Sequence, residues 1–373
     1  MKNTLILIAM AVMFSCAKQT VKPVLIDEAS FKTEHDGKTM ELFTLKNANG
    51  IVAQITNYGG KVVNLWTPDK NGDFADIVTG YETSAEYLNT TEIYYGTLIG
   101  RYGNRIAKGQ FTLNDSVYTL AQNNGENHLH GGIKGFNNVV WDAKKLDGQT
   151  LELKYLSVDG EEGYPGNLNV KVVYTLTNDN ELKIEYWATT DKPTPVNFTH
   201  HSFFNLKGAG NGDINDHIMM INADGFTPVD STLIPTGEIA PVEGTPFDFR
   251  TPTAIGARIA EDNQQLKFGG GYDHNWVINK AETGLNYAAK VVEPASGRTM
   301  EVLTNEPGIQ FYGGNFMTGN DTGKGKTFAY RGAFCLETQH FPDSPNKPQF
   351  PSTILNPGEE YYSVCVYKFG VEK

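Results

Sequence analysis

The sequence predicts an all-β protein, built as a large antiparallel β-sandwich with few short helices. Strand-like runs of alternating apolar residues recur along the chain. Turn residues separate them at short intervals, with 39 Gly and 17 Pro among 373 residues. No strand alternates with a long helical pattern, which argues against a doubly wound α/β fold. A hydrophobic content of 39% is typical of a globular chain that can bury a sizeable core.

The N-terminal residues are predicted to be a targeting segment. Lys2 supplies a positive charge, and Leu5–Phe14 form an apolar run that is too short to span a bilayer. The run ends at Ser15-Cys16, which resembles the lipobox of bacterial lipoproteins, where the cysteine is lipidated and becomes the mature N-terminus. The two residues before Ser15 differ from the usual lipobox pattern. Ordinary signal-peptidase cleavage near Ser15 is therefore the alternative.

This signal divides the chain into three parts. Residues 1–16 are expected to be a lipoprotein-type signal peptide with Cys16 as the mature N-terminus, and residues 17–26 a polar tether. Residues 27–373 are expected to form one domain, because no low-complexity linker interrupts them. We expect a protein that is exported in a bacterium and held at the membrane only by a lipid anchor at Cys16. It would face the periplasm as a monomer or weak dimer.

The elements of the sandwich can be assigned in chain order. Three predicted strand pairs each enclose a turn of Asn, Asp or Gly, which is a hairpin signature. They span residues 41–56, 110–120 and 168–189. Two short helices are predicted, Thr83–Leu88 and Thr253–Glu261, since each begins at a threonine that can cap the first turn.

Charge and cysteine content exclude several classes of function. The net charge of −12, spread along the chain, provides no basic surface for nucleic acid. Cys335 and Cys365 lie in strand-like runs and are expected to be buried free thiols, and no Cys-x-x-Cys pair offers a zinc site. His128-x-His130 could bind metal from one strand face, but the glutamate of the cupin metal motif is missing four and five residues later. We therefore expect no bound metal.

Four short segments combine proton-transfer groups with glycine or aromatic residues. Imidazoles can exchange protons near neutral pH, carboxylates can accept protons or orient hydroxyls, and aromatic rings can stack on the apolar face of a sugar. Because these segments are far apart in the sequence, they can meet only if the fold converges on one cleft. The pattern indicates an enzyme that acts on a small polyhydroxylated molecule. The segments are His128–Gly132, Thr199–Leu206, Gly271–Trp276 and Leu336–Pro342.

Glu337 is the strongest single candidate for a catalytic base. It follows an apolar run and lies near a predicted strand end, where desolvation would raise its pKa towards a useful value. The alternative is a salt-bridged glutamate on the polar face of the strand. His200 and His201 point to opposite faces of an extended segment, so one of them is expected to serve the site. Trp276 is a candidate for stacking on a sugar.

Other candidates offer hydrogen bonds to a ligand. His130 precedes Gly131-Gly132, which are expected to leave room for a ligand, so a role without metal is favoured. Asn104 and Arg105 provide an amide and a planar donor fork suited to vicinal hydroxyls. Asp273 could orient hydroxyls, or it could only close an Asx-turn.

Seven segments occur in a fixed order along the mature sequence: Gly100–Gly109, Asn127–Gly132, Gly160–Gly166, Asn197–Leu206, Gly271–Asn275, Pro307–Tyr312 and Leu336–Asp343. Together they resemble the aldose 1-epimerase (galactose mutarotase) family. The resemblance implies a galactose mutarotase-like supersandwich. It also implies an isomerase that interconverts the α and β anomers of free aldohexoses such as glucose and galactose, without cofactor or metal.

The resemblance implies a role for each matching residue. Glu337 would be the general base, His201 the general acid and His130 the second histidine, and Asn104, Arg105 and Asp273 would bind substrate. In the simplest assignment Glu337 is ionised and His201 is protonated before the reaction begins.

Four other functions are alternatives to this assignment. A non-catalytic sugar-binding lipoprotein would not need Glu337 together with both histidines. A mutarotase for another aldose would keep the same groups, whereas one for a sugar phosphate should show a basic cluster, which Arg105 alone does not provide. A glycosidase needs two carboxylates that flank the bond it cleaves. Asp273 and Glu337 could be interpreted as such a pair.

Overall fold

The computed structural model describes residues 20–281 and 283–372. The predicted signal peptide, Cys16 and the first residues of the tether lie outside this part of the chain. Within the described residues, no helix is long and apolar enough to cross a membrane.

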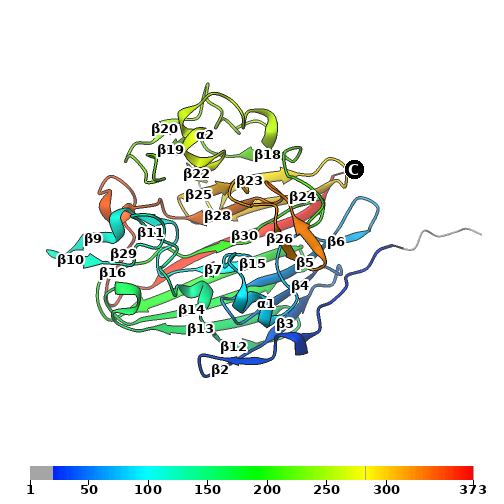
Figure 1. Cartoon of the computed structure of the whole chain (residues 1–373), viewed down its shortest axis with the longest axis horizontal. Coiled ribbons are helices and arrows are strands. Elements are labelled where there is room, and N and C mark those ends of the chain that lie inside the picture. Colours follow the sequence, from blue (N-terminus) through cyan, green and yellow to red (C-terminus); the bar gives the residue numbers. More distant parts are fainter. Residues whose placement is uncertain (1–19, 282, 373) are drawn as a thin grey trace, which may run out of the picture.

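A nine-stranded antiparallel sheet forms the larger layer. Its central strands are long and pair continuously, and Figure 1 shows β13, β14, β15 and β30 side by side across the molecule. In sheet order the strands are β12 (Asp142–Lys145), β13 (Thr150–Ser157), β14 (Leu168–Leu176), β15 (Glu181–Thr190), β30 (Tyr361–Val371), β24 (Arg298–Thr304), β23 (Asn286–Val292), β18 (Ile218–Ile221) and β21 (Thr253–Ala254).

Two smaller sheets form the opposing layer. One contains β20 (Ala240–Pro241), β19 (Gly225–Thr227), β22 (Asp273–Val277), β25 (Gly308–Tyr312) and β28 (Cys335–Gln339) in sheet order, and the other contains β3 (Leu42–Lys46), β4 (Val52–Thr56), β5 (Val62–Pro68) and β6 (Phe74–Asp76). One hydrophobic cluster joins the layers. It contains Leu153 and Val302 of the large sheet together with Ile55 and Phe311 of the smaller ones. The predicted all-β sandwich is confirmed.

Short elements connect these sheets and carry much of the site. The two-stranded pairs are β1 (Thr33–His35) with β2 (Lys38–Met40), β7 (Thr97–Ile99) with β17 (Thr199–His201), β8 (Arg105–Ile106) with β11 (His128–Leu129), β9 (Gln110–Leu113) with β10 (Ser116–Thr119), β16 (Thr194–Pro195) with β29 (Ile354–Leu355), and β26 (Asp321–Gly323) with β27 (Lys326–Phe328). The helices are α1 (Ser84–Asn89), α2 (Gln264–Gly269) and the 3-10 turns η1 (Glu28–Phe31), η2 (Ala107–Gly109), η3 (Phe136–Asn138), η4 (Glu161–Gly163), η5 (Ile255–Ala257) and η6 (Ser344–Asn346).

The three predicted hairpins and the first predicted helix are confirmed. The hairpins are β3–β4, β9–β10 and β14–β15. In the first turn the Asn47 side chain accepts hydrogen bonds from the backbone N–H groups of Asn49 and Ile51, as turn chemistry leads one to expect. Helix α1 is capped by Thr83, whose hydroxyl accepts from the Glu86 N–H.

The predicted helix Thr253–Glu261 is wrong. Thr253 and Ala254 instead form β21, which pairs with β18 at the edge of the large sheet, and only the single 3-10 turn η5 follows. Pairing with a distant strand and burial of Ile255 outweigh the weak local helix propensity. The helix of this region lies later in the chain, as α2, capped by Asn263. Cys335 and Cys365 are buried free thiols, as predicted.

Candidate active site

A cleft of about 560 Å³ opens where β17, β22 and β28 meet the turns around β8 and β11. All six residues to which the family resemblance assigns a role line it, although they are spread over residues 104 to 337. They are Asn104, Arg105, His130, His201, Asp273 and Glu337.

Glu337 lies on β28, opposite Gln310 of β25, and is only 2% exposed. Its Oε1 lies 3.5 Å from His201 Nε2, whereas Oε2 has no hydrogen-bond partner among the described residues. Burial raises the pKa of the carboxyl well above its usual value, and the negative charge of Asp273 adds to this effect. Glu337 is therefore a buried carboxyl group whose Oε1 approaches His201 and whose Oε2 is unpaired among the described residues.

His201 ends β17 and faces the cleft, while His200 points into the core, where its Nε2 lies 2.7 Å from the Ser202 hydroxyl. The His201 ring stacks on Phe203, and its Nδ1 lies 3.5 Å from the Cys335 sulfur. Nε2 is therefore the nitrogen that approaches Glu337. Burial lowers the pKa of His201 to about 4.

His130 follows β11 in a left-handed conformation, with φ of 52°. The Asn104 backbone N–H donates to its Nδ1 at 3.2 Å, so the neutral ring carries its proton on Nε2. Burial lowers the pKa of His130 well below its usual value, and the neighbouring His201 acts in the same direction. His130 is thus a neutral hydrogen-bond donor, 5.2 Å from the His201 ring between centroids.

The prediction that Gly131 and Gly132 leave room for a ligand is wrong. A Cβ on Gly131 would lie 1.9 Å from the Gly100 carbonyl oxygen, and one on Gly132 would lie 2.1 Å from the Glu162 side chain. The glycines let three parts of the chain approach closely, and this packing holds the His130 turn.

Asp273, Arg105 and Asn104 form the polar wall of the cleft. The Arg105 guanidinium lies 3.9 Å from Asp273 Oδ2, and Gln310 donates to Asp273 Oδ1 at 2.8 Å. The Asn104 side-chain oxygen accepts from the Arg105 backbone N–H. These contacts hold a carboxylate and a donor fork in place beside the cleft, where they can bind neighbouring hydroxyl groups.

The predicted stacking role of Trp276 is wrong. This side chain is 1% exposed and donates to the Phe247 carbonyl oxygen in the core. Because side chains alternate along β22, Asp273 and Trp276 lie on opposite faces of the strand. The aromatic residues that line the cleft are Tyr94, Phe203, Phe268, Tyr312 and Phe316.

Tyr94 is the most informative residue that sequence reasoning missed. Its ring contacts both His130 and His201, with centroids 4.9 and 5.7 Å apart. The only signal was a pair of tyrosines just before a strand-like run, which also fits a core position.

The cleft also provides a possible set of metal ligands. One atom each of His130, His201 and Glu337 lie within 4.8 Å of one another. Two imidazole nitrogens and a carboxylate oxygen are donors that zinc accepts. A divalent ion bound there would occupy the same atoms that proton transfer to a sugar requires.

The chain matches known proteins over most of its length. The family model described as Aldose 1-epimerase matches residues 41–368. Galactose mutarotase of Sus scrofa is 45% identical over 334 residues, which cover 89% of this chain and 95% of the relative. Aldose 1-epimerase of Escherichia coli (strain K12) is 37% identical over 339 residues, covering 90% and 97%.

Solved structures agree with the sequence matches. An aldose epimerase homologue from C. elegans superposes with a TM-score of 0.82 at 29% identity, covering 90% of this chain and 100% of its own. Galactose 1-epimerase from Lactobacillus acidophilus gives a TM-score of 0.79 at 28% identity, covering 92% and 98%.

Proposed function

Because the chain belongs to the aldose 1-epimerase family and interconverts the anomers of aldoses, we propose that Glu337, His201 and His130 carry out this isomerisation. The observation that carries the proposal is the 3.5 Å separation of Glu337 Oε1 and His201 Nε2 in a buried cleft. A base and an acid at this spacing can act on the anomeric hydroxyl and the ring oxygen of one sugar.

The reaction breaks and reforms the bond between C1 and the ring oxygen. Glu337 takes the proton of the anomeric hydroxyl while His201 Nε2 delivers a proton to the ring oxygen, and C1 becomes an aldehyde carbon. Rotation about C1–C2 presents the other aldehyde face, and closure reverses both transfers. The Nε2–H of His130 stabilises the charge that develops near the ring oxygen. Asp273, Arg105 and Asn104 hold the remaining hydroxyls.

The pKa shifts support a pair that shares one proton. With the pKa of Glu337 raised and that of His201 lowered, a single proton on the pair in the free protein rests on Glu337 rather than on His201. The reactive arrangement, a carboxylate beside an imidazolium, contains the same number of protons. A sugar hydroxyl that donates a hydrogen bond to Glu337 stabilises the ionised carboxylate over the protonated acid. Substrate binding therefore promotes transfer of the proton from Glu337 to His201. The two groups titrate as a pair.

We propose free aldohexoses such as glucose and galactose as substrates, because the charge of the cleft disfavours a sugar phosphate. Arg105 is the only arginine or lysine among the described residues that line the cleft, which also contains Glu92, Glu126, Asp273 and Glu337. Even with Glu337 protonated, the acidic side chains outnumber Arg105, and their charge disfavours the phosphate group of a sugar phosphate.

Polarimetry of freshly dissolved α-glucose, α-galactose and α-xylose tests the function directly. A chelator is included because His130, His201 and Glu337 could bind a contaminating divalent ion. We expect faster mutarotation than in buffer alone with no cofactor added. Activity that is lost on chelation and returns with metal would contradict the proposed mechanism.

The remaining expectations concern the whole chain. In this proposal residues 1–16 are a signal peptide, Cys16 carries a lipid, residues 17–26 are a tether and residues 27–373 form one catalytic domain. The protein is exported and faces the periplasm as a monomer or weak dimer. The short apolar run that ends at Ser15-Cys16 supports the anchor.

A further inference from the structure

Lys61 is a buried lysine to which the proposed reaction gives no role. It directly precedes β5 and is 1% exposed. Among the described residues, the hydrogen bonds that its Nζ donates go to two backbone carbonyl oxygens, that of Ile93 at 2.9 Å and that of Asn137 at 2.8 Å. Lysine is almost never fully buried without a charged partner, because desolvation of the ammonium group is costly. The two carbonyl contacts are therefore expected to serve a specific purpose.

The first contact fixes the peptide bond before Tyr94. Lys61 binds the carbonyl oxygen of the Ile93–Tyr94 peptide, and the N–H of the same peptide donates to Glu92 Oε1 at 3.0 Å. The carbonyl oxygen of Tyr94 in turn accepts from the Thr97 N–H at 3.4 Å. Side chains thus hold both polar atoms of one peptide, which limits where the Tyr94 ring can lie.

The Tyr94 ring packs against both catalytic histidines. It stacks on the His201 ring with an interplanar angle of 24° and a centroid distance of 5.7 Å. It meets the His130 ring at 60°, with centroids 4.9 Å apart. A displacement of about 1 Å at a reacting group can cost roughly 100-fold in rate, so a ring that supports both imidazoles can affect turnover.

The second contact of Lys61 reaches another segment that packs on His130. Asn137 belongs to η3, and Gly135 directly precedes this turn. A Cβ on Gly135 would lie 2.7 Å from the His130 carbonyl oxygen, so the two segments are in close contact. Lys61 therefore joins two parts of the chain that each contact His130.

This arrangement does not require Lys61 to be charged. Burial lowers the pKa of Lys61 to about 7, and the carboxylate of Glu92 opposes the shift. An ammonium group and a neutral amine can both donate two hydrogen bonds, so either form can hold the two carbonyl oxygens.

We propose that Lys61 is a positioning residue for the isomerisation, which binds the Ile93 and Asn137 carbonyl oxygens and so holds Tyr94 against the two catalytic histidines. The proposal rests on the roles proposed above for these histidines. Loss of Lys61 would displace the proton-transfer groups and leave the residues that bind the sugar hydroxyls in place. It would then affect kcat more than KM.

Lys61→Met tests the proposal, because it removes the N–H donors and keeps the length of the side chain. We expect kcat for galactose, measured by polarimetry, to fall about tenfold, with KM changed by less than about twofold. The Tm should also fall, because two buried carbonyl oxygens lose a donor. Lys61→Gln, which keeps N–H donors on a side chain one atom shorter, should give a smaller loss of kcat.

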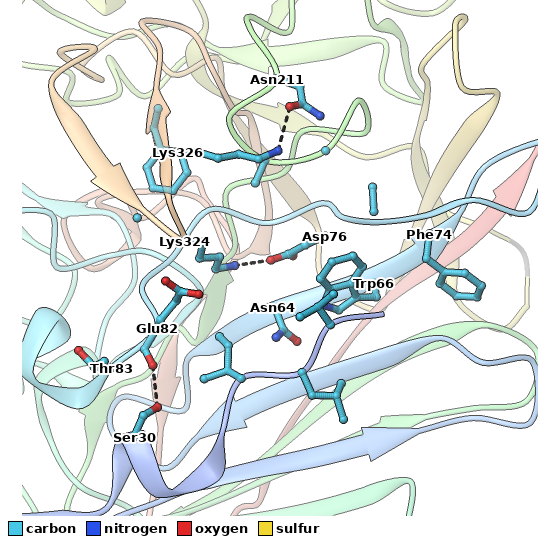
Figure 2. A pocket seen from close by; sticks show the side chains of 18 of the residues that line it. Ser30, Asn64, Trp66, Phe74, Asp76, Glu82, Thr83, Asn211, Lys324 and Lys326 are labelled. Atoms are coloured by element: carbon cyan, nitrogen blue, oxygen red, sulfur yellow. Dashed lines mark hydrogen bonds and ion pairs between the residues drawn. The ribbon is translucent and has the colours of Figure 1, made fainter. Parts of the chain in front are cut away.

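Lys324→Met is the matched control for loss of a buried lysine. Figure 2 shows Lys324 directed at Asp76, where its Nζ donates to Oδ2 at 2.6 Å, and it also donates to the Val78 carbonyl oxygen at 2.9 Å. Lys324 lines a separate cavity beside β5 and β6 that shares no lining residue with the catalytic cleft. This variant should lower the Tm and leave kcat unchanged.

A double-mutant cycle shows whether Lys61 acts through Tyr94. Tyr94→Leu alone should lower kcat about tenfold, and Lys61→Met should add little in that background, because the ring it positions is already gone. Losses that multiply to about a hundredfold would overturn the proposal. Unchanged kcat in Tyr94→Leu, or in both Lys61 variants, would overturn it as well. A wild type that does not speed mutarotation would contradict the proposed function itself, and this inference with it.

Discussion

At the scale of single residues, the acid–base pair can be tested by removing one member at a time. Glu337→Gln and His201→Asn should each lower kcat by on the order of 10²- to 10⁴-fold, the usual worth of a positioned acid or base. Sugar affinity should persist because each substitute keeps a similar shape and hydrogen-bonding capacity. Polarimetry gives kcat, and titration with methyl β-galactoside gives the affinity.

Glu301→Gln, on β24 and outside the cleft, is the matched control for loss of a carboxylate. It should leave kcat unchanged. Near-wild-type turnover in Glu337→Gln would assign the proton transfer to another group.

The pH dependence of kcat/KM should be bell-shaped. The acid limb should report His201 and the alkaline limb Glu337, which is the reverse of the simplest assignment. As the pH falls through about 4, His201 becomes protonated while Glu337 keeps its proton. The pair then carries two protons, and no carboxylate remains to act as the base. As the pH rises through the raised pKa of Glu337, the last proton leaves and the acid is lost. The active one-proton form therefore lies between the pKa of His201 and the raised pKa of Glu337.

His201→Asn distinguishes the two assignments. Only Glu337 then titrates, so residual kcat/KM should rise with pH through the raised carboxyl pKa, with no alkaline decline. The pH at the midpoint of this rise should be higher than the pH at the midpoint of the acid limb of the wild type. A persistent alkaline limb would show that His130 or another group supplies the acid.

At the scale of elements, the turn after β11 positions His130 through the close packing of Gly131. Gly131 has a φ of 83°, and a Cβ there would clash with the Gly100 carbonyl oxygen. Gly131→Ala should lower both the Tm and kcat/KM, because the backbone must shift and displace the His130 ring. Thermal unfolding and polarimetry measure the two effects.

Gly358→Ala is the matched control for this effect. Gly358 has a φ of 87°, but a Cβ at this position would have no atom of the described residues within 4 Å, so the alanine incurs only the left-handed backbone cost of roughly 1 kcal/mol. It should lower the Tm slightly and leave kcat/KM unchanged. Equal losses of activity in both variants would show that the close packing of Gly131 does not position His130.

At the scale of the whole molecule, the proposed lipid anchor can be tested by removing the Cys16 thiol. Cys16→Ala should abolish incorporation of a labelled fatty acid and lipoprotein-type processing, because the modified thiol is gone. Cys365→Ala, which removes a buried thiol from β30, should leave labelling intact. Labelling that persists in Cys16→Ala, or never occurs in the wild type, would contradict the anchor.

The sequence by itself determined the features whose causes are local or concentrated in short motifs. Asn47 and its glycine specify a hairpin, and Thr83 caps a helix, because these effects act within a few residues. The motifs that contain His201 and Glu337 also predicted that these two residues lie in the site. Strand alternation could have excluded Trp276 from the site, because it lies three residues from Asp273 on one strand.

Tertiary structure alone decided features that depend on distant segments. Residues 253–254 form a strand because they pair with β18, which is distant in the sequence. A glycine is required at position 131 because the Gly100 carbonyl oxygen lies where a Cβ would be. Burial shifts the pKa values of Glu337 and His201 in the directions opposite to those that the expected resting protonation requires. Turn preferences and alternation act along the chain, whereas desolvation and close contact depend on which remote segments the fold brings together.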